Sequence, residues 1–301
     1  MAEVRLEKRH ADRRKRIAAV RRGKVARKSM SEPRAPEANT IERWAYDYVT
    51  TMSLAAKLSP PPPPSPRRWE VDPPARRLEA PGRPAELRIT ERAEKTRGLR
   101  AASGRARALH TFLHHELQAA ELMAWALLAF PETPIEFREG LLRIALDEVR
   151  HMRVYAEQIA RLGHKVGDFA VRDWFWTRIP TCRDPASFVA VMGLGLESAN
   201  LEHTASFAAR FREAGDEEGA RAQELVGLEE IAHVRFGVRW FQHFTGGLEF
   251  DVWARALPSP LTPLLMRGRP LRRDVRLRAG QPERFVDQLE AWEPSDVAPS
   301  T

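Results

Sequence analysis

Two seven-residue segments share one pattern of acids, histidine and arginine. Residues 147–153 read DEVRHMR, and residues 229–235, which begin 82 positions later, read EEIAHVR. Each segment contains Glu-x-x-His: Glu148 with His151, and Glu230 with His233. Residues three apart on an α-helix lie on one face, with Cβ atoms about 5–6 Å apart, so a carboxylate and an imidazole in this pattern can hold the same metal ion. Because the motif is repeated with its flanking acid and arginine, we favour a metal site over chance.

A site for two metal ions needs two further carboxylates, one for each Glu-x-x-His helix. Glu116 lies 32 residues before Glu148, and Glu197 lies 33 residues before Glu230. Both fall on apolar lines of their predicted helices, where an unpaired carboxylate is costly to bury. The predicted metal ligands are Glu116, Glu148, His151, Glu197, Glu230 and His233.

Two other carboxylates have equally good spacing. Glu121 and Glu202 each lie five residues after a preferred ligand, but they share their helical lines with histidine or serine instead of apolar residues. Periodicity therefore favours Glu116 and Glu197 as the ligands.

Several side chains near the motifs are candidates for contacts with the ligands: Asp147, Glu229, Tyr155, Arg153 and Arg235. Asp147 and Glu229 precede His151 and His233 by four positions, within helical reach, so they can accept hydrogen bonds from the imidazoles. The alternatives are a solvent-facing acid, a core tyrosine and ordinary surface arginines. No catalytic residue beyond the ligands is identified.

Two glycines, Gly193 and Gly195, stand just before Glu197 in a predicted helix. Glycine destabilises a helix interior by about 1 kcal/mol relative to alanine, so its presence needs a reason. Close helix packing is one explanation. A small pocket or a flexible turn beside the metals is the other.

Charge and cysteine content limit the classes of protein. The net charge of +8 lies entirely within residues 1–40, so the rest of the chain is neutral. Cys182 is the only cysteine, which excludes an intramolecular disulfide and fits a reducing compartment. There is no apolar run of 18 residues and no apolar segment typical of a secretory signal, so we expect a cytoplasmic protein without membrane contact.

The composition divides the chain into four predicted regions. These are a basic arm (1–40), a short helix with a Pro-rich linker or strap (41–104), a four-helix bundle (105–245) and a Pro/Arg-rich tail (246–301) with one short helix near 282–292. The arm is either a solvated extension or a contact for nucleic acid or another polyanion. The bundle helices are expected over about 106–129, 133–163, 184–212 and 216–244, with one long crossover between the second and the third.

The segments HHELQAAEL, DEVRHMR, LGHKVGDF and GDEEGARAQELVGLEEIAHVRFGVRWF resemble a bacterial family of ferritin-like proteins named only as a domain of unknown function. The resemblance covers residues 105–245 and, less closely, 41–85. It implies an all-α, ferritin-like four-helix bundle with one long crossover and a dinuclear iron centre held by the six ligands above. It brings no established substrate.

Donors of this kind, rich in carboxylates with one histidine per metal, favour two iron ions, with manganese or a mixed Fe/Mn pair as alternatives. We expect an oxidoreductase that activates O2 or peroxide, of the oxidase or hydroxylase type. Its substrate, a small molecule or a macromolecule, is unknown, and it would need an electron donor. The second hypothesis is an iron-handling or storage protein with ferroxidase activity. The third is a non-catalytic bundle or binding module with a polyanion-binding arm.

Overall fold

The computed structural model describes residues 35–92 and 98–294. Within these residues the secondary structure is helical, apart from one isolated bridge between Ile89 and Val171. The prediction of an all-α protein is confirmed for this part of the chain. No helix in it is long and apolar enough to cross a membrane. Almost all of the predicted basic arm lies outside the described residues.

The first long hairpin consists of helices α4 (Ala102–Ala129) and α5 (Ile135–Arg161), which pack along each other. The order Thr133, Pro134, Ile135, Glu136 is typical of a helix start capped by threonine, but Thr133 does not cap α5. The Thr133 hydroxyl instead donates to the carbonyl of Phe130, 2.7 Å away, and so closes the turn between the helices. Pro134 then occupies the N-cap position of α5 without a side-chain cap.

The third bundle helix is interrupted. It begins as α6 (Pro185–Val191), where the Asp184 side chain accepts from the backbone N–H of Ser187. It then passes through a π-helical turn, Met192–Leu196, and continues as α7 (Glu197–Glu213). Single π-helical turns inside α-helices are often found at functional sites.

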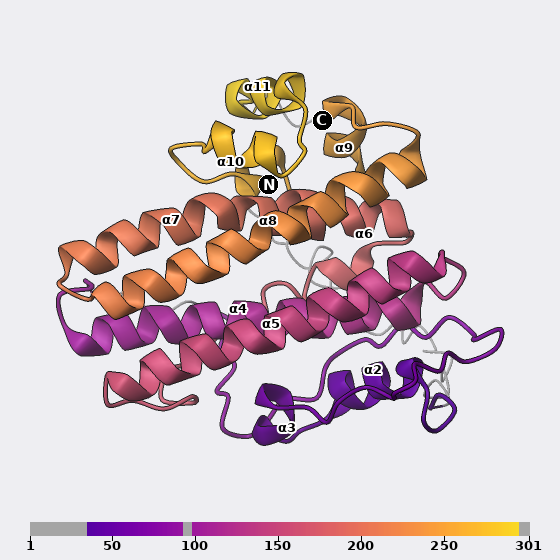
Figure 1. Cartoon of the computed structure of the whole chain (residues 1–301), viewed down its shortest axis with the longest axis horizontal. Coiled ribbons are helices and arrows are strands. Elements are labelled where there is room, and N and C mark those ends of the chain that lie inside the picture. Colours follow the sequence, from indigo (N-terminus) through magenta and orange to yellow (C-terminus); the bar gives the residue numbers. More distant parts are fainter. Residues whose placement is uncertain (1–34, 93–97, 295–301) are drawn as a thin grey trace, which may run out of the picture. The chain divides into compact units, whose positions relative to one another are not determined.

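Helix α8 (Glu217–Thr245) completes a second hairpin with α7 and packs against α5 and α6. The connection from α5 to α6 is the long crossover, and it contains the short 3-10 helix Ile179–Thr181. The two hairpins lie one above the other in Figure 1. Their inward faces carry the apolar core, which includes the fully buried Trp125, Phe137 and Phe241.

The segments outside the hairpins cover opposite sides of the bundle (Figure 1). On the N-terminal side, α2 (Ile41–Thr50) packs on α4 and α3 (Leu54–Leu58) packs on α5. On the other side the tail contributes α9 (Phe250–Ala256), the 3-10 helix η3 (Pro263–Met266), α10 (Arg273–Arg278) and α11 (Glu283–Ala291). The tail is thus more helical than the one predicted helix, because α9 and α10 are too short to show a clear period in the sequence.

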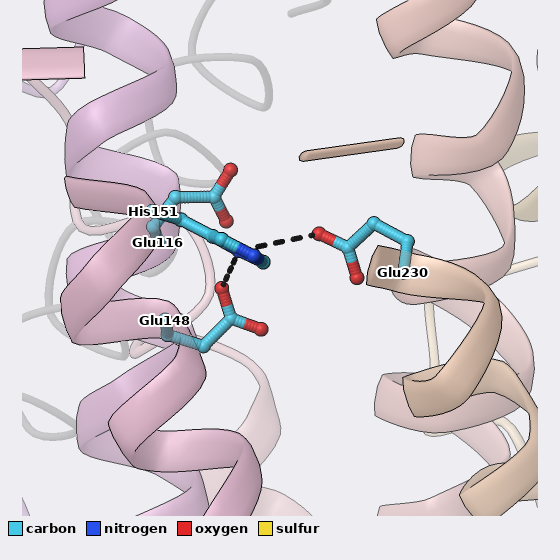
Figure 2. A group of neighbouring side chains, drawn as sticks. All are labelled: Glu116, Glu148, His151 and Glu230. Carbon is cyan, nitrogen blue, oxygen red and sulfur yellow. Dashed lines mark hydrogen bonds and ion pairs between the residues drawn. The ribbon is translucent and has the colours of Figure 1, made fainter. Parts of the chain in front are cut away.

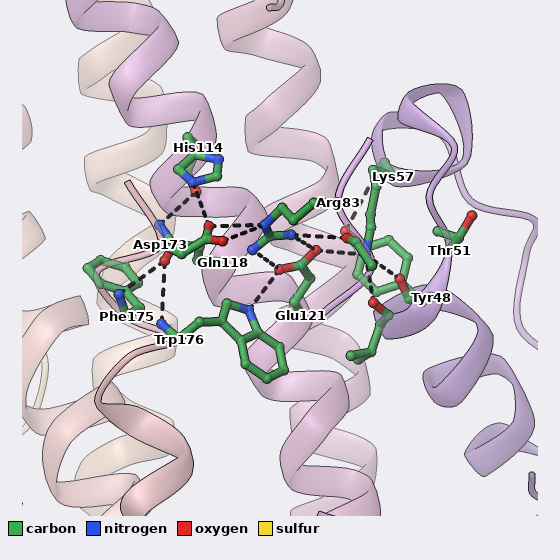
Figure 3. A network of polar contacts seen from close by, with 12 residues as sticks. Tyr48, Thr51, Lys57, Arg83, His114, Gln118, Glu121, Asp173, Phe175 and Trp176 are labelled. Atoms are coloured by element: carbon green, nitrogen blue, oxygen red, sulfur yellow. Dashed lines mark hydrogen bonds and ion pairs between the residues drawn. The ribbon is translucent and has the colours of Figure 1, made fainter. Parts of the chain in front are cut away.

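A buried carboxylate anchors the N-terminal segment (Figure 3). Glu121 on α4 is 2.7 Å from Lys57 Nζ and 2.6 Å from Arg83 Nη1. The indole N–H of Trp176, from the crossover, donates to the same carboxylate over 2.8 Å. Glu121 therefore joins three segments that are far apart in the sequence.

Glu202 on α7 does the same for the C-terminal tail. Its carboxylate accepts from Arg276 Nη2 over 2.6 Å and from Arg276 Nε over 2.8 Å, and both side chains are buried. Because each of these two rivals for the metal site is already paired with a buried cation, it needs no metal ion to be accommodated in the core.

Candidate metal centre

The structure brings all six predicted ligands together in the middle of the bundle. They lie on α4, α5, α7 and α8, and all six are buried. Their donor atoms form two overlapping groups, each with atoms within 4.8 Å of one another. One group is Glu116, Glu148, His151 and Glu230; the other is Glu148, Glu197, Glu230 and His233.

Glu148 and Glu230 belong to both groups. Glu148 lies on α5 of the first hairpin and Glu230 lies on α8 of the second. Figure 2 shows Glu230 reaching from α8 toward the residues of α4 and α5. Two carboxylates common to two four-donor groups are the arrangement that would let both bridge a pair of metal ions. Glu116 and Glu197 each belong to one group and would serve one ion.

The two imidazoles point the same ring nitrogen inward. His151 Nδ1 lies 3.0 Å from Glu148 Oε2 and 3.8 Å from Glu230 Oε1. His233 Nδ1 lies 2.9 Å from Glu230 Oε2 and 3.1 Å from Glu148 Oε1. Both Nδ1 atoms therefore face the shared carboxylates, which is where a ligand atom must be.

The Nε2 atom of each histidine points away from the shared carboxylates and contacts an acid on the other helix of the pair α5 and α8. His151 Nε2 lies 2.8 Å from Glu229 Oε2, and His233 Nε2 lies 3.5 Å from Asp147 Oδ2. The spacing predicts that each histidine contacts the acid four positions earlier on its own helix, and these crossed contacts show that this pairing is wrong. An imidazole whose Nδ1 faces the core directs Nε2 across the interface between α5 and α8.

Arg150 is a contact that the sequence reasoning missed. Its Nη2 lies 3.0 Å from Asp147 Oδ1 and 2.8 Å from Glu229 Oε2, so one guanidinium joins the two outer acids. The signal was the arginine within the first motif, which has alanine at the equivalent position of the second motif, Ala232.

The electrostatics of the centre favour a cation. Burial raises the pKa of Glu116 well above its ordinary value, and the neighbouring carboxylates raise it further. Burial and the charges of Glu230 and Glu148 likewise raise the pKa of Glu197. Without hydrogen-bond partners within the described residues, Glu197 Oε1 is a buried acceptor that a metal ion would satisfy. The residues present therefore fit a metal pair.

The histidines respond in the opposite sense. Burial alone would lower the pKa of His151, but the Glu148 carboxylate beside it, together with Glu230, raises that pKa to about 9. The same balance raises the pKa of His233 well above its ordinary value. With no ion bound, protons shared with the imidazoles therefore offset the carboxylate charge, and a metal ion would take over that role.

Asn200 is a second missed contact. It lies on α7, three positions after Glu197 and hence on the same helix face, and its Nδ2 donates to Glu230 Oε1 over 3.0 Å. This hydrogen bond fixes one shared carboxylate from a third helix.

Tyr155 is fully buried beside the centre. Burial, followed by the charges of Glu116 and Glu230, raises its pKa well above the ordinary value, and a hydrogen bond with Gln223 opposes that shift. Tyr155 is thus a core tyrosine that also lies within electrostatic reach of the ligands.

Arg153 and Arg235 do not contact the ligand carboxylates, so of the two alternatives the surface arginine is the one that the structure shows. Both are exposed. Arg153 Nε donates to the carbonyl of Leu58, and Arg235 donates to the carbonyl of Arg278. They fasten the outer segments to α5 and α8, because two positions beyond each histidine the helix has turned away from the core.

The two glycines serve close packing. A Cβ on Gly193 would come within 2.7 Å of Gly237 Cα on α8, and a Cβ on Gly195 would come within 2.6 Å of Met266 Sδ. Close packing, the first of the two explanations, therefore accounts for both glycines, and Gly193 only borders a space of about 10 Å³ beside Glu197 and His233. Both belong to the π-helical turn that leads directly into Glu197.

Open space lies next to this turn instead. A cavity of about 140 Å³ is bounded by the ligands Glu116 and Glu197, and its other walls include Phe112, Phe175 and Leu265. His115 and His203, which are not among the predicted ligands, also line it. The cavity connects the side of the centre facing α4 and α7 with the outside of the bundle.

The comparisons with known proteins agree with the resemblance of the motifs. A family model described as "Protein of unknown function (DUF455)" matches residues 9–287. Neither a curated protein nor a solved structure matches the chain.

Proposed function

Since the chain belongs to the DUF455 family of unknown function, we propose from the geometry of its site that it is a ferritin-like protein with two metal ions that oxidises a small molecule with O2 or a peroxide. The observation that carries this proposal is the pair of four-donor groups sharing Glu148 and Glu230. The long crossover between two helical hairpins supports the ferritin-like arrangement.

The donor set supports iron. Each group offers three carboxylates and one imidazole, and none offers a thiolate. Oxygen-rich sites with a single histidine favour iron or manganese, whereas structural zinc sites more often use cysteine. Two iron ions are therefore the proposed cofactor, with manganese or a mixed pair as the outcomes that metal analysis would distinguish.

The ligands have distinct roles in this proposal. Glu148 and Glu230 would contribute to both ions, Glu116 and His151 would complete one site, and Glu197 and His233 would complete the other. Glu229 and Asp147 would accept hydrogen bonds from the Nε2–H groups of His151 and His233 and so keep the imidazoles turned inward. When bound, the metal pair supplies the electrons that reduce the oxidant.

The surroundings favour oxidation of an organic molecule over iron storage. A storage protein passes hydrated cations to its centre, and a hydrated cation is poorly accommodated by aromatic and aliphatic walls. The cavity that reaches Glu116 and Glu197 has mainly such walls. A bound organic molecule in this cavity would displace water from beside Glu116 and Glu197, which protects reactive species from side reactions.

The proposal is tested first by metal content. Full-length protein purified without chelator should contain two metal ions per chain, whereas Glu148→Ala should lose metal and remain largely helical by circular dichroism. Glu213→Ala, at an exposed site on α7, is the matched control. Full metal content in Glu148→Ala would show that the ions bind elsewhere.

The reaction is tested with the reduced, iron-loaded protein. Stopped-flow mixing with O2 or H2O2 should give a rapid absorbance transient, and the reaction should stop after about one turnover per site unless a reductant is added. Continuous uptake of many iron ions per chain would support storage instead. No reaction with either oxidant would support a structural metal.

A further inference from the structure

We propose that the cavity beside Glu116 and Glu197 binds the substrate, and that this substrate is a small organic molecule about the size of a benzene ring with a single hydrogen-bonding group. That the bound molecule is a substrate rests on the proposed function, whereas binding in the cavity does not require a metal ion.

The cavity lies beside the candidate metal centre. Its walls include one carboxylate from each hairpin, Glu116 on α4 and Glu197 on α7. These are the two ligands that belong to only one donor group each, whereas the shared Glu148 and Glu230 do not line it. A molecule in the cavity would therefore approach both metal sites from the same side. Of the two buried ligand oxygens without a hydrogen-bond partner in the described residues, Glu148 Oε1 and Glu197 Oε1, the second belongs to a residue of the cavity wall.

Volume sets the size of the ligand. The cavity has about 140 Å³, and an apolar cavity of roughly 150 Å³ in another protein is known to hold benzene. A nucleotide, a sugar or a long acyl chain would not fit without a rearrangement of the walls. Macromolecular substrates are excluded for the same reason, unless a single small group is inserted.

The chemistry of the walls sets the class of ligand. Phe112 and Phe175 provide aromatic surface, and Ala119 and Ala199 leave room between the helices. His115 is half-buried and His203 is exposed, and no hydrogen bond to either ring is formed within the described part of the chain, so each ring is available to a polar group of a ligand. An apolar body with one hydroxyl or carbonyl group satisfies both features.

Two walls come from outside the four helices. Phe175 belongs to the crossover, where its ring stacks on His115 with centroids 5.2 Å apart. Leu265 belongs to η3 of the tail, and 49% of its surface is exposed at the rim. The crossover and the tail thus close a space that the bundle alone would leave open, so these added segments would determine which molecules enter.

The experiment measures binding of 4-fluorophenol by 19F NMR to the full-length protein, both as purified and after treatment with a chelator. We expect saturable binding of one molecule per chain. Ala199→Leu and Ala119→Leu fill the cavity from opposite walls, and each should weaken binding by at least about tenfold. Ala205→Leu is the control, because Ala205 lies on the same helix as Ala199 but lines a separate groove on the outer side of α7.

A variant that enlarges the cavity keeps the proposal testable if the two leucine variants fail to fold. Phe175→Ala enlarges the cavity and should allow the larger 6-fluoroindole to bind, whereas the unmodified protein should bind it at least about tenfold more weakly. Absence of 4-fluorophenol binding, or unchanged binding in both filled variants, would overturn the proposal.

Metal analysis of the same samples separates this inference from the proposed function. Binding that disappears in Ala199→Leu while its metal content equals that of the unmodified protein supports both. If the unmodified protein contains no metal but still binds 4-fluorophenol in this cavity, the proposed function fails and the binding site stands.

Discussion

His151 Nε2 lies 2.8 Å from Oε2 of Glu229, although His151 is on α5 and Glu229 is on α8. The reciprocal contact joins His233 of α8 to Asp147 of α5. Each histidine is therefore oriented by the other hairpin. Correct placement of either imidazole depends on docking of the two hairpins, and the centre is complete only when the bundle is assembled.

This crossed arrangement predicts which metal each acid supports. Replacing an acid that orients a ligating histidine typically weakens metal binding about 10–100-fold. Glu229→Gln should lower occupancy at the ion beside His151, and Asp147→Asn should lower it at the ion beside His233. Anomalous diffraction from iron-loaded crystals measures the two occupancies separately. The control is Glu213→Gln, at an exposed site on α7. The opposite assignment would contradict the crossed contacts.

Replacing a ligand that belongs to both donor groups should remove more metal ions than replacing a ligand that belongs to one group. Glu230 belongs to both donor groups, so Glu230→Ala should reduce the content from two ions to less than one per chain. Glu116 belongs to one group, so Glu116→Ala should retain about one ion. Elemental analysis with matched protein determination gives both values. Equal losses in the two variants would argue against shared carboxylates.

The two buried anchors should contribute strongly to stability. Removing one member of a buried ion pair leaves an uncompensated charge and typically costs about 3–5 kcal/mol. Glu121→Ala would leave Lys57 without its carboxylate partner, while Arg83 would keep its ion pair with Asp173. Glu202→Ala would leave Arg276 without its carboxylate partner. Each should lower the free energy of unfolding by about this amount, as measured by denaturant titration.

The control for these anchors is the exposed ion-pair cluster of Arg212 with Glu217 and Glu224. Solvent screens such pairs, so Arg212→Ala should leave the unfolding midpoint nearly unchanged. A loss in Arg212→Ala similar to that in Glu121→Ala would show that burial does not explain the effect.

Contact between the π-helical turn and α8 predicts the effect of adding one methyl group. Gly193→Ala places Cβ within 2.7 Å of Gly237 Cα, and overpacking of this kind typically costs about 1–3 kcal/mol. Thermal unfolding should show the loss, and metal content should report whether Glu197 moves. Gly98→Ala is the comparison, since a Cβ there meets nothing within 4 Å. Equal stability of the two variants would mean that the helices separate freely.

Cys182 should be unreactive in the folded protein. Burial, the largest effect on this thiol, raises its pKa to about 12. At pH 8 the thiolate fraction is then of order one in ten thousand, so alkylation by iodoacetamide should be roughly a thousandfold slower than in the unfolded chain. Mass spectrometry with and without denaturant measures the two rates. Rapid labelling under native conditions would contradict the buried position.

The six ligands are predictable from the sequence because each is identified by spacing within a single helix. Glu148 and His151 are on one helix face by spacing alone, and the second motif repeats the first. Periodicity also distinguished Glu116 from Glu121, since only the former follows an apolar line. What periodicity did not show is that Glu121 is buried as well, because its cations Lys57 and Arg83 are distant in sequence.

The four bundle helices, the repeated Glu and Glu-x-x-His pattern and the family resemblance are predictable from the chain alone, because they depend on short-range spacing. The break in the third bundle helix and the short tail helices α9 and α10 are not. Tertiary structure decided which acid orients which histidine, that Arg153 and Arg235 face away from the ligands, and that the glycines pack on neighbours. It also placed Phe175 and Leu265 over the cavity. These features depend on how helices and connecting segments dock, and a contact between residues a hundred positions apart leaves no periodic signal in one sequence.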